Sequence, residues 1–297
     1  MPRSAAPSAF ALTRQDWAML VVCLLWGANF SITKLGLQQI PPLGFTAIRF
    51  TSASIVLWLV LRWWEGPAPL PPRTIWLLIW LGVLGNTIYQ ICFMLGLDLT
   101  SATHSALIIS TVPTVVAVLA GIFRLERITS RMIWGIAIGT IGVVIVVSAR
   151  GHGVVPGSLT GDLITVGAVL CWSVYTLGLR KVPESVSPLR VTSITMITGT
   201  PGLILAGLPD LFRTNWRAVT LAGWGSVAYA ALLSLVLAYI LWNNSVRVIG
   251  SSRTAVYLCI TPIFAVIIAW FALGEQPAPI QALGAALIIW GVLLSRR

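Results

Sequence analysis

Charged residues are scarce in this chain. Asp, Glu, Lys and Arg make up 9% of its 297 residues, whereas hydrophobic residues make up 57%. A soluble domain carries roughly 25% charged residues, so a soluble fold of this length would lack the polar surface that it needs. The shortage of charge therefore excludes an ordinary soluble protein and indicates an integral membrane protein.

Acidic residues are the scarcer of the two signs, with 8 Asp and Glu against 19 Lys and Arg and a net charge of +11. In a soluble protein this excess of base would suggest nucleic-acid binding. Here the bases stand singly or in small groups between apolar runs. We therefore interpret them as topology signals and contacts with membrane lipid, and we expect no nucleic-acid partner.

The chain also has few residues that bind metals or perform acid–base chemistry. The cysteines are Cys23, Cys92, Cys171 and Cys259, and the histidines are His104 and His152. The cysteines lie in apolar runs, without C-x-x-C or histidine spacings, so we expect packing residues, no metal and no cofactor. Paired carboxylates and Ser–His arrangements are also missing, which argues against an enzyme; a membrane-embedded enzyme remains the weaker alternative.

Long apolar runs, separated by charges and by Pro or Gly, fill most of the chain. A helix that crosses a bilayer needs about 20 mostly apolar residues. Applying that length predicts ten transmembrane helices joined by short connections. The predicted spans are 16–35, 43–63, 73–96, 101–122, 131–149, 162–180, 189–208, 218–243, 252–272 and 278–295. The sequence thus predicts an all-α membrane protein.

The positions of the bases predict the orientation of these spans. If the N-terminus is cytoplasmic, Arg49 lies within a span, and 14 of the other Lys and Arg fall on the cytoplasmic side. The four that fall outside are Lys34, Arg150, Arg213 and Arg217. Because positive charge collects on the cytoplasmic side, we expect a multi-pass protein of the cell inner membrane. Both termini would be cytoplasmic, beginning with a short tail.

Landmarks in the first half of the chain recur in the second half. At an offset of 146 residues, Trp26, Lys34 and Pro42 recur as Trp172, Arg180 and Pro188. At an offset of 149 residues, Pro113, Glu126, Gly135 and Gly142 recur as Pro262, Glu275, Gly284 and Gly291. The chain therefore divides into repeats at 1–149 and 150–297. Each repeat has five spans, and because five is odd the second repeat would be inverted, as in secondary transporters.

The repeated acids differ in their surroundings. Glu126 is flanked by Arg124, Arg127 and Arg131, whereas Glu275 has no basic neighbour. The positive-inside rule predicts this difference if the two loops face opposite sides of the membrane. We expect both acids to be structural, each interacting with the free N–H groups at the start of the helix that follows it.

The pattern Pro-x12-Glu-x8-Gly-x6-Gly occurs twice, from Pro113 and from Pro262. With two five-helix repeats, it resembles the EamA family of the drug/metabolite transporter superfamily. Size and topology also resemble the family's bacterial amino-acid exporters of the YddG type. The resemblance implies export of metabolites, including aromatic or apolar amino acids, by alternating access through a central cavity. Spans 1–4 and 6–9 would line that cavity, with spans 5 and 10 at the periphery.

Other cargo within the same class stays open. Hydrophobic cationic drugs would favour an acidic cavity, and molecules like nucleotide sugars would favour several embedded bases. The sequence shows no embedded acid at the proposed midplane and only Arg49 as an embedded base. Amino acids are therefore the leading hypothesis, with drugs or other small metabolites as the alternative.

Polar and aromatic side chains within the spans are candidates for the substrate site, because polar groups in a membrane are paired or functional. Asn86, Tyr89 and Gln90 share one helix face. The other candidates are Trp26, Asn29, Arg49, Trp172, Tyr175, Ser234, Tyr239 and Tyr257. Together these amides, hydroxyls and rings suit a zwitterion with an apolar or aromatic side chain.

The sequence leaves two roles open for Arg49. Arg49 would either attract a carboxylate near the cavity mouth or serve a structural role, bonded to helix carbonyls or snorkelling outwards. We assign Trp242, near the cytoplasmic end of its span, to the aromatic belt at the membrane interface.

Helix breakers, small residues and the lack of a midplane acid each supply one further expectation. Pro113 and Pro262 lie mid-span and would form kinks, either static or moving during gating. The GxxxG at Gly135 and Gly139 would pack helices closely, within the chain or in a dimer, so a monomer and a dimer both stay open. The midplane lacks an acid, whereas proton- and sodium-coupled carriers commonly use an embedded carboxylate. We therefore expect facilitated diffusion or coupling through weaker groups.

Overall fold

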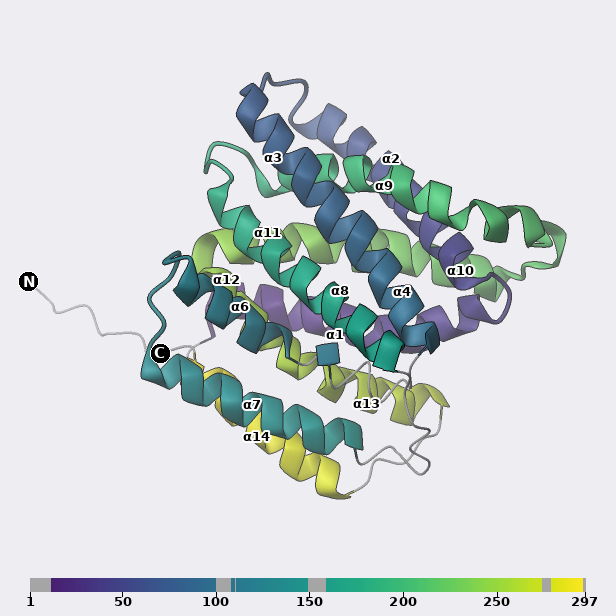
Figure 1. Ribbon diagram of the computed structural model, residues 1–297. Helices are drawn as coiled ribbons and strands as arrows, with labels where there is room; N and C mark the ends of the chain where they lie inside the picture. The colour runs from purple at the N-terminus through teal and green to yellow at the C-terminus, as the bar shows by residue number, and fades with distance from the viewer. Residues whose placement is uncertain (1–11, 100–107, 110, 149–158, 274–278, 296–297) are drawn as a thin grey trace, which may run out of the picture.

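The computed structural model describes residues 12–99, 108–109, 111–148, 159–273 and 279–295, and every regular element within these ranges is helical (Figure 1). The prediction of an all-helical chain is thus confirmed for the described residues. The first half holds α1 (Arg14–Leu37), α2 (Pro42–Trp64), α3 (Pro72–Gly82), the π-helical η1 (Val83–Ile88), α4 (Tyr89–Leu99), α6 (Val112–Ile122) and α7 (Ser130–Ser148).

The second half has a corresponding order of elements. It holds α8 (Leu159–Gly178), η2 (Leu179–Lys181), α9 (Pro188–Arg213), η3 (Trp216–Ala218), α10 (Leu221–Tyr229), the π-helical η4 (Ala230–Leu237), α11 (Ala238–Ile249), α12 (Ser251–Val256), η5 (Tyr257–Ile260), α13 (Thr261–Leu273) and α14 (Pro279–Ser295). The predicted spans match these elements closely, except that most of 101–111 lies outside the described residues.

Seven helices of the described part are long and apolar enough to cross a membrane, and three more apolar helices are shorter. The seven are Arg14–Leu37, Pro42–Trp64, Pro72–Gly96, Leu159–Lys181, Pro188–Arg213, Leu221–Ile249 and Ser251–Ile268. The shorter ones are Val112–Ile122, Ser130–Ile145 and Pro279–Ser295. The protein is therefore a multi-pass membrane protein, and the exact number of ten spans remains a prediction.

Helices α2 and α9 pack side by side and run antiparallel (Figure 1). The Ser54 and Thr200 hydroxyls lie 2.7 Å apart. Ser193, earlier in α9, donates to the carbonyl of Leu57, which is later in α2, at 3.3 Å. These helices hold equivalent positions in the two halves. An inverted repeat requires equivalent helices to run in opposite directions, and this pair does so.

Helices α7 and α14 form a second antiparallel pair of equivalents, at the lower edge of the view in Figure 1. A Cβ on Gly135 would lie 2.5 Å from the Gly291 carbonyl oxygen, and one on Gly142 would lie 2.6 Å from that of Gly284. The backbones are thus too close for any side chain at these positions. The small residues predicted to pack helices are used here within the chain.

One π-helical segment interrupts the third helix of each half. Segment η1 joins α3 to α4, and η4 joins α10 to α11. The predicted spans 73–96 and 218–243 correspond to the continuous helical stretches Pro72–Gly96 and Leu221–Ile249. The π segments inside them were not predicted. A π segment widens the helix by one residue in a turn and occurs frequently at functional sites. Both segments pack against the α2–α9 pair, η1 on α9 and η4 on α2.

The repeated prolines stand at the starts of helices. Pro113 is the second residue of α6, and Pro262 is the second residue of α13, directly after the 3-10 segment η5. A proline suits this position because the first N–H groups of a helix have no partner within it. Pro262 therefore does mark a change of helix geometry within a predicted span, and its movement during gating remains a prediction.

Candidate functional site

Four large aromatic side chains from three helices meet in the interior. They are Trp26 of α1, Trp172 of α8, and Tyr239 and Trp242 of α11, and we call them the aromatic cluster. The ring centroids of Trp26 lie 5.9 Å from those of both Trp172 and Tyr239. Trp242 lies 5.4 Å from Trp26 and 5.6 Å from Trp172. These separations are typical of favourable ring–ring contacts.

The cluster joins the two halves through equivalent residues. Trp26 and Trp172 occupy matching positions in the repeat, and their rings make an edge-to-face contact with an interplanar angle of 74°. Equivalent side chains can touch only if they lie near the axis that relates the halves. The indole N–H of Trp26 donates to the Ser234 carbonyl in η4, at 2.9 Å. The π segment thereby orients one of the central rings.

Trp242 corrects the sequence-based prediction. We had assigned it to the aromatic belt at the membrane interface, but its side chain is 0% exposed and stands inside the cluster. The belt assignment suits other tryptophans, since Trp63 and Trp76 are 92% and 70% exposed. The pattern of aromatics along α11 does not distinguish these two environments.

A polar group lies against one side of the cluster. Arg49 of α2 is 6% exposed, and its guanidinium donates to the Gln90 side-chain oxygen at 3.0 Å. Tyr89 and Tyr239 lie close enough to Arg49 for electrostatic interaction. Tyr89 also contacts Trp172, with ring centroids 5.0 Å apart. Four predicted site residues from α2, α4 and α11 are thus brought together beside the aromatic rings.

Arg49 is a buried charge with incomplete pairing. Its guanidinium lies 5.8 Å from the Phe45 ring and 5.6 Å from the Phe50 ring, which are cation–π distances. Its Nε is buried and has no hydrogen-bond partner. Within the described ranges Arg49 forms no ion pair with a carboxylate. Because a buried charge without a counter-charge is expensive, Arg49 has capacity for an anionic group that the described part of the chain does not provide.

The candidate amides and hydroxyls nearby also have unused acceptors. Asn86, in η1, donates to the Thr195 carbonyl at 2.9 Å, while its side-chain oxygen is buried without a partner. The side-chain oxygens of Asn29 and Ser234 are likewise buried and unpartnered. Buried polar atoms are usually hydrogen-bonded. These three acceptors, from α1 and both π segments, are therefore available for hydrogen-bond donors on a ligand.

Tyr175 and Tyr257 are held in other contacts. The Tyr175 ring touches Trp172 at 5.3 Å, and its hydroxyl donates to Asn243 at 3.1 Å. Asn243 in turn donates to Thr192 at 2.8 Å, a link between α11 and α9 that no local pattern in the sequence predicts. Tyr257 donates to Asp16 in the first turn of α1. Its backbone carbonyl accepts a hydrogen bond from Cys23, three residues before Trp26, at 3.0 Å. The role of Tyr257 at the site remains a prediction.

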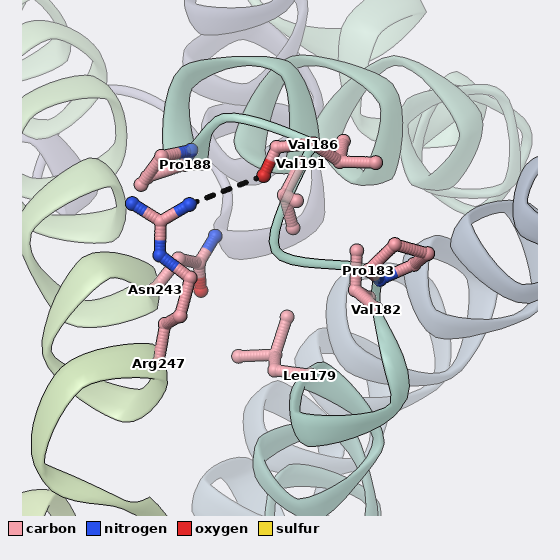
Figure 2. Close-up of a pocket in the computed structure, with 8 residues that line it drawn as sticks. All are labelled: Leu179, Val182, Pro183, Val186, Pro188, Val191, Asn243 and Arg247. Atoms are coloured by element: carbon pink, nitrogen blue, oxygen red, sulfur yellow. Dashed lines mark hydrogen bonds between the residues drawn. The ribbon is translucent and has the colours of Figure 1, made fainter.

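A small recess lies at the end of α11 that follows the cluster (Figure 2). Asn243 and Arg247 line one side of it, and the α8–α9 connection lines the other. Figure 2 shows the Arg247 guanidinium reaching across to the Val186 carbonyl, at 3.3 Å. The recess measures about 20 Å³. That volume accommodates a single water and is too small for an amino acid.

Glu126 binds a different helix from the one that we expected. Its carboxylate accepts hydrogen bonds from the Ser251 N–H at 2.5 Å, the Ser251 hydroxyl at 2.6 Å and the Ser252 N–H at 3.1 Å. It therefore caps α12 in the second half of the chain, rather than α7, which follows it. A chain reversal at Gly250, with φ of 92°, presents these N–H groups. Its repeat partner Glu275 lies outside the described residues.

These bonds also determine the protonation of Glu126. Partial burial raises the pKa of the carboxyl group, but the hydrogen bonds from Ser251 and Ser252 favour the carboxylate more strongly. The net result is a pKa below the ordinary value of 4.5. Glu126 is therefore ionised at neutral pH and holds the α6–α7 connection to the start of α12.

Known transporters resemble this chain over nearly its whole length. The EamA-like transporter family matches residues 13–148 and 159–297. The uncharacterized transporter YyaM of Bacillus subtilis is 30% identical over 279 residues, which is 93% of this chain and 91% of that protein. A probable terminal-alkyne amino-acid exporter of Streptantibioticus cattleyicolor is 26% identical over 289 residues, covering 96% of this chain and 94% of that protein.

A crystal structure of another protein has the same fold. It matches with a TM-score of 0.77 at 19% sequence identity, covering 96% of this chain and 97% of that chain. At this identity the likeness shows the fold alone. The family match over both halves, the relatives of equal length and the helical membrane architecture agree with one another. On these grounds the chain belongs to the EamA-like transporter family.

Proposed function

We propose that this transporter exports amino acids with apolar or aromatic side chains, and related metabolites, across a bacterial inner membrane. The carboxylate of the substrate would pair with Arg49, and its apolar part would contact the aromatic cluster. The relative in Streptantibioticus cattleyicolor is named a probable amino-acid exporter, which supports this class of cargo over drugs or other metabolites.

The incomplete pairing of Arg49 carries the proposal. Its guanidinium is 6% exposed, has an unpartnered Nε and forms no ion pair within the described residues. A planar guanidinium matches a carboxylate in two parallel hydrogen bonds. A substrate carboxylate would thus compensate a charge that the protein leaves buried. The unpartnered oxygens of Asn29, Asn86 and Ser234 would accept hydrogen bonds from the substrate ammonium.

Alternating access between two inverted five-helix halves is the mechanism that we propose. The antiparallel arrangement of α2 with α9 supports an inverted repeat of ten spans. The contact between Trp26 and Trp172 lies where the halves meet. Substrate sites of inverted-repeat transporters lie at this interface near the midplane. If the two halves exchanged conformations, the aromatic cluster would open to one side of the membrane and then to the other. Both termini would be cytoplasmic.

Transport without coupling to protons is the expectation for this site. Among the described residues, Arg49 has only Gln90 as a side-chain hydrogen-bond partner, and the groups around it are tyrosines and phenylalanines. None of these changes its charge near neutral pH. Export would then follow the concentration gradient of the substrate. A strong response of proteoliposome uptake to an imposed pH gradient would contradict this part of the proposal.

The decisive experiment compares an amino acid with its decarboxylated analogue. Proteoliposomes would be assayed with tryptophan and tryptamine, and then with a panel of other amino acids. We expect wild type to prefer the acid, and Arg49→Gln to raise the apparent KM for tryptophan roughly 10- to 100-fold, the equivalent of one charged hydrogen-bonded contact. Transport of tryptamine would change little.

Two variants make the comparison specific to the charge. Arg49→Lys retains a cation and should recover part of the preference for the acid. Arg62→Gln removes an exposed arginine from the same helix and should behave as wild type. A folded Arg49→Gln protein that still prefers tryptophan over tryptamine as strongly as wild type would overturn the proposal.

A further inference from the structure

A second polar site lies away from the aromatic cluster, at the end of the molecule that we expect to be cytoplasmic. A groove of about 390 Å³ lies where three segments meet: the α6–α7 connection, the residues after α8, and the junction of α11 with α12. Its lining includes four arginines, which are Arg127, Arg180, Arg247 and Arg253. Its size is that of a small-molecule site.

The groove carries an excess of positive charge. Four arginines against the two glutamates of the lining, Glu126 and Glu184, leave a formal charge of +2. The Glu126 carboxylate is directed at Ser251 and Ser252 by three hydrogen bonds. None of the four arginines forms an ion pair within the described part of the chain. The groove therefore lacks the counter-charge that would neutralise it.

The arginines form two pairs with different roles. Arg180 donates to the carbonyl of Arg247 at 2.8 Å, and Arg247 donates to carbonyls of the α8–α9 connection. These two guanidiniums are held in place by the backbone. Arg127 and Arg253 are exposed, and neither side chain donates a hydrogen bond to another described residue. Their guanidinium donors are thus available to a ligand.

The groove also borders the lipid-facing surface. Val248 lines it and is 55% exposed. Ile133 and Trp134, which follow the groove residue Met132 at the start of α7, are 57% and 65% exposed. Exposed apolar side chains on a membrane protein contact acyl chains, and tryptophan is typical of the interface. A basic groove therefore adjoins an apolar surface near the level of the headgroups.

We propose that this groove binds a phosphate group, with Arg127 and Arg253 as its principal ligands. Guanidinium groups bind phosphate oxygens through charge-assisted, often paired, hydrogen bonds. The phosphate is carried either by the headgroup of an anionic phospholipid or by a soluble phosphate compound. Basic sites between membrane helices favour anionic headgroups in this way. The site is separate from the substrate site at Arg49 and does not depend on the proposed cargo.

The experiment measures the thermal stability of the purified full chain by tryptophan fluorescence at constant ionic strength. The three probes are a short-chain phosphatidylglycerol, the matching phosphatidylcholine and inorganic phosphate. A ligand that binds the folded state raises the unfolding temperature in a saturable way. We expect phosphatidylglycerol to do so, with an apparent affinity weakened roughly tenfold or more in an Arg127→Gln/Arg253→Gln double variant.

A matched control and the alternative outcomes complete the test. Arg213→Gln/Arg217→Gln removes two exposed arginines elsewhere and should respond as wild type. Saturable stabilisation by inorganic phosphate, lost in the groove variant alone, would support the site and identify a soluble source. Equal stabilisation by phosphatidylcholine, or equal responses of wild type and the groove variant to every probe, would overturn the proposal. Since both arginines are exposed, their replacement should not prevent folding.

Discussion

Replacing Glu126 with alanine removes a link between the two halves of the protein. The carboxylate accepts three hydrogen bonds from Ser251 and Ser252, and these satisfy two N–H groups at the start of α12. Hydrogen bonds to a charged group contribute about 1.5–3 kcal/mol each when buried, and partial exposure reduces this. We therefore expect Glu126→Ala to lower the free energy of unfolding by about 2 kcal/mol.

The same carboxylate predicts a dependence on pH. The pKa of Glu126 in the folded protein lies below its ordinary value of 4.5. Its contribution to stability is therefore complete above about pH 4.5 and is lost as the pH falls through the lower folded pKa. Glu126→Gln keeps the shape of the side chain but cannot ionise. The stability difference between wild type and Glu126→Gln should be constant near neutral pH and should shrink below about pH 4.5.

Thermal unfolding of the detergent-solubilised protein, followed by tryptophan fluorescence, measures both effects. A loss of about 2 kcal/mol corresponds to a decrease in Tm of roughly 4–8 °C. Glu184→Gln is the control, because Glu184 is an exposed acid of the same groove without a side-chain bond in the structure. If Glu126→Ala and Glu184→Gln had the same Tm, or if Glu126→Gln followed wild type at every pH, the capping role would be refuted.

Three further outcomes are expected. Gly142→Ala should lower Tm, because its Cβ would lie 2.6 Å from the Gly284 carbonyl oxygen, whereas Gly225→Ala, with open space around it, should not. Trp172→Ala should reduce proteoliposome transport at least tenfold and destabilise the protein by about 3–5 kcal/mol, because the ring contacts Trp26, Tyr89 and Tyr239. Trp76→Ala, which replaces a 70% exposed tryptophan of α3, is the control. Replacing both repeated prolines with alanine should slow transport, and an unchanged rate would show that the kinks are static.

The helices of this protein were predictable because the signals for them are local. The span predicted at 43–63 corresponds to α2 at Pro42–Trp64, and that predicted at 189–208 begins one residue from α9 at Pro188–Arg213. Apolar length sets the minimum for crossing a bilayer, and proline marks a first helical turn. The π segments were missed because one extra residue in a helical turn leaves no signature in composition.

The site was predictable in part. Candidates chosen for polarity and aromaticity within spans, such as Trp26, Arg49 and Gln90, do lie among ring contacts and buried hydrogen bonds. Their role in binding substrate remains a prediction. Trp242 was misplaced at the interface, whereas the assignment of Tyr257 to the cavity remains a prediction. Sequence position along a span indicates depth in the membrane but not which neighbouring helix a side chain meets.

The sequence by itself determined the membrane class, the helical spans and the repeated landmarks, because hydrophobicity and residue spacing act along the chain. Only the tertiary structure decided which residues meet. Trp26 binds the carbonyl of Ser234, which is 208 residues away, and Glu126 caps a helix that begins 125 residues later. Such contacts depend on the packing of helices from both halves. The local pattern marks Glu126 as a capping acid, and the packing of α12 beside α6 determines which helix it caps.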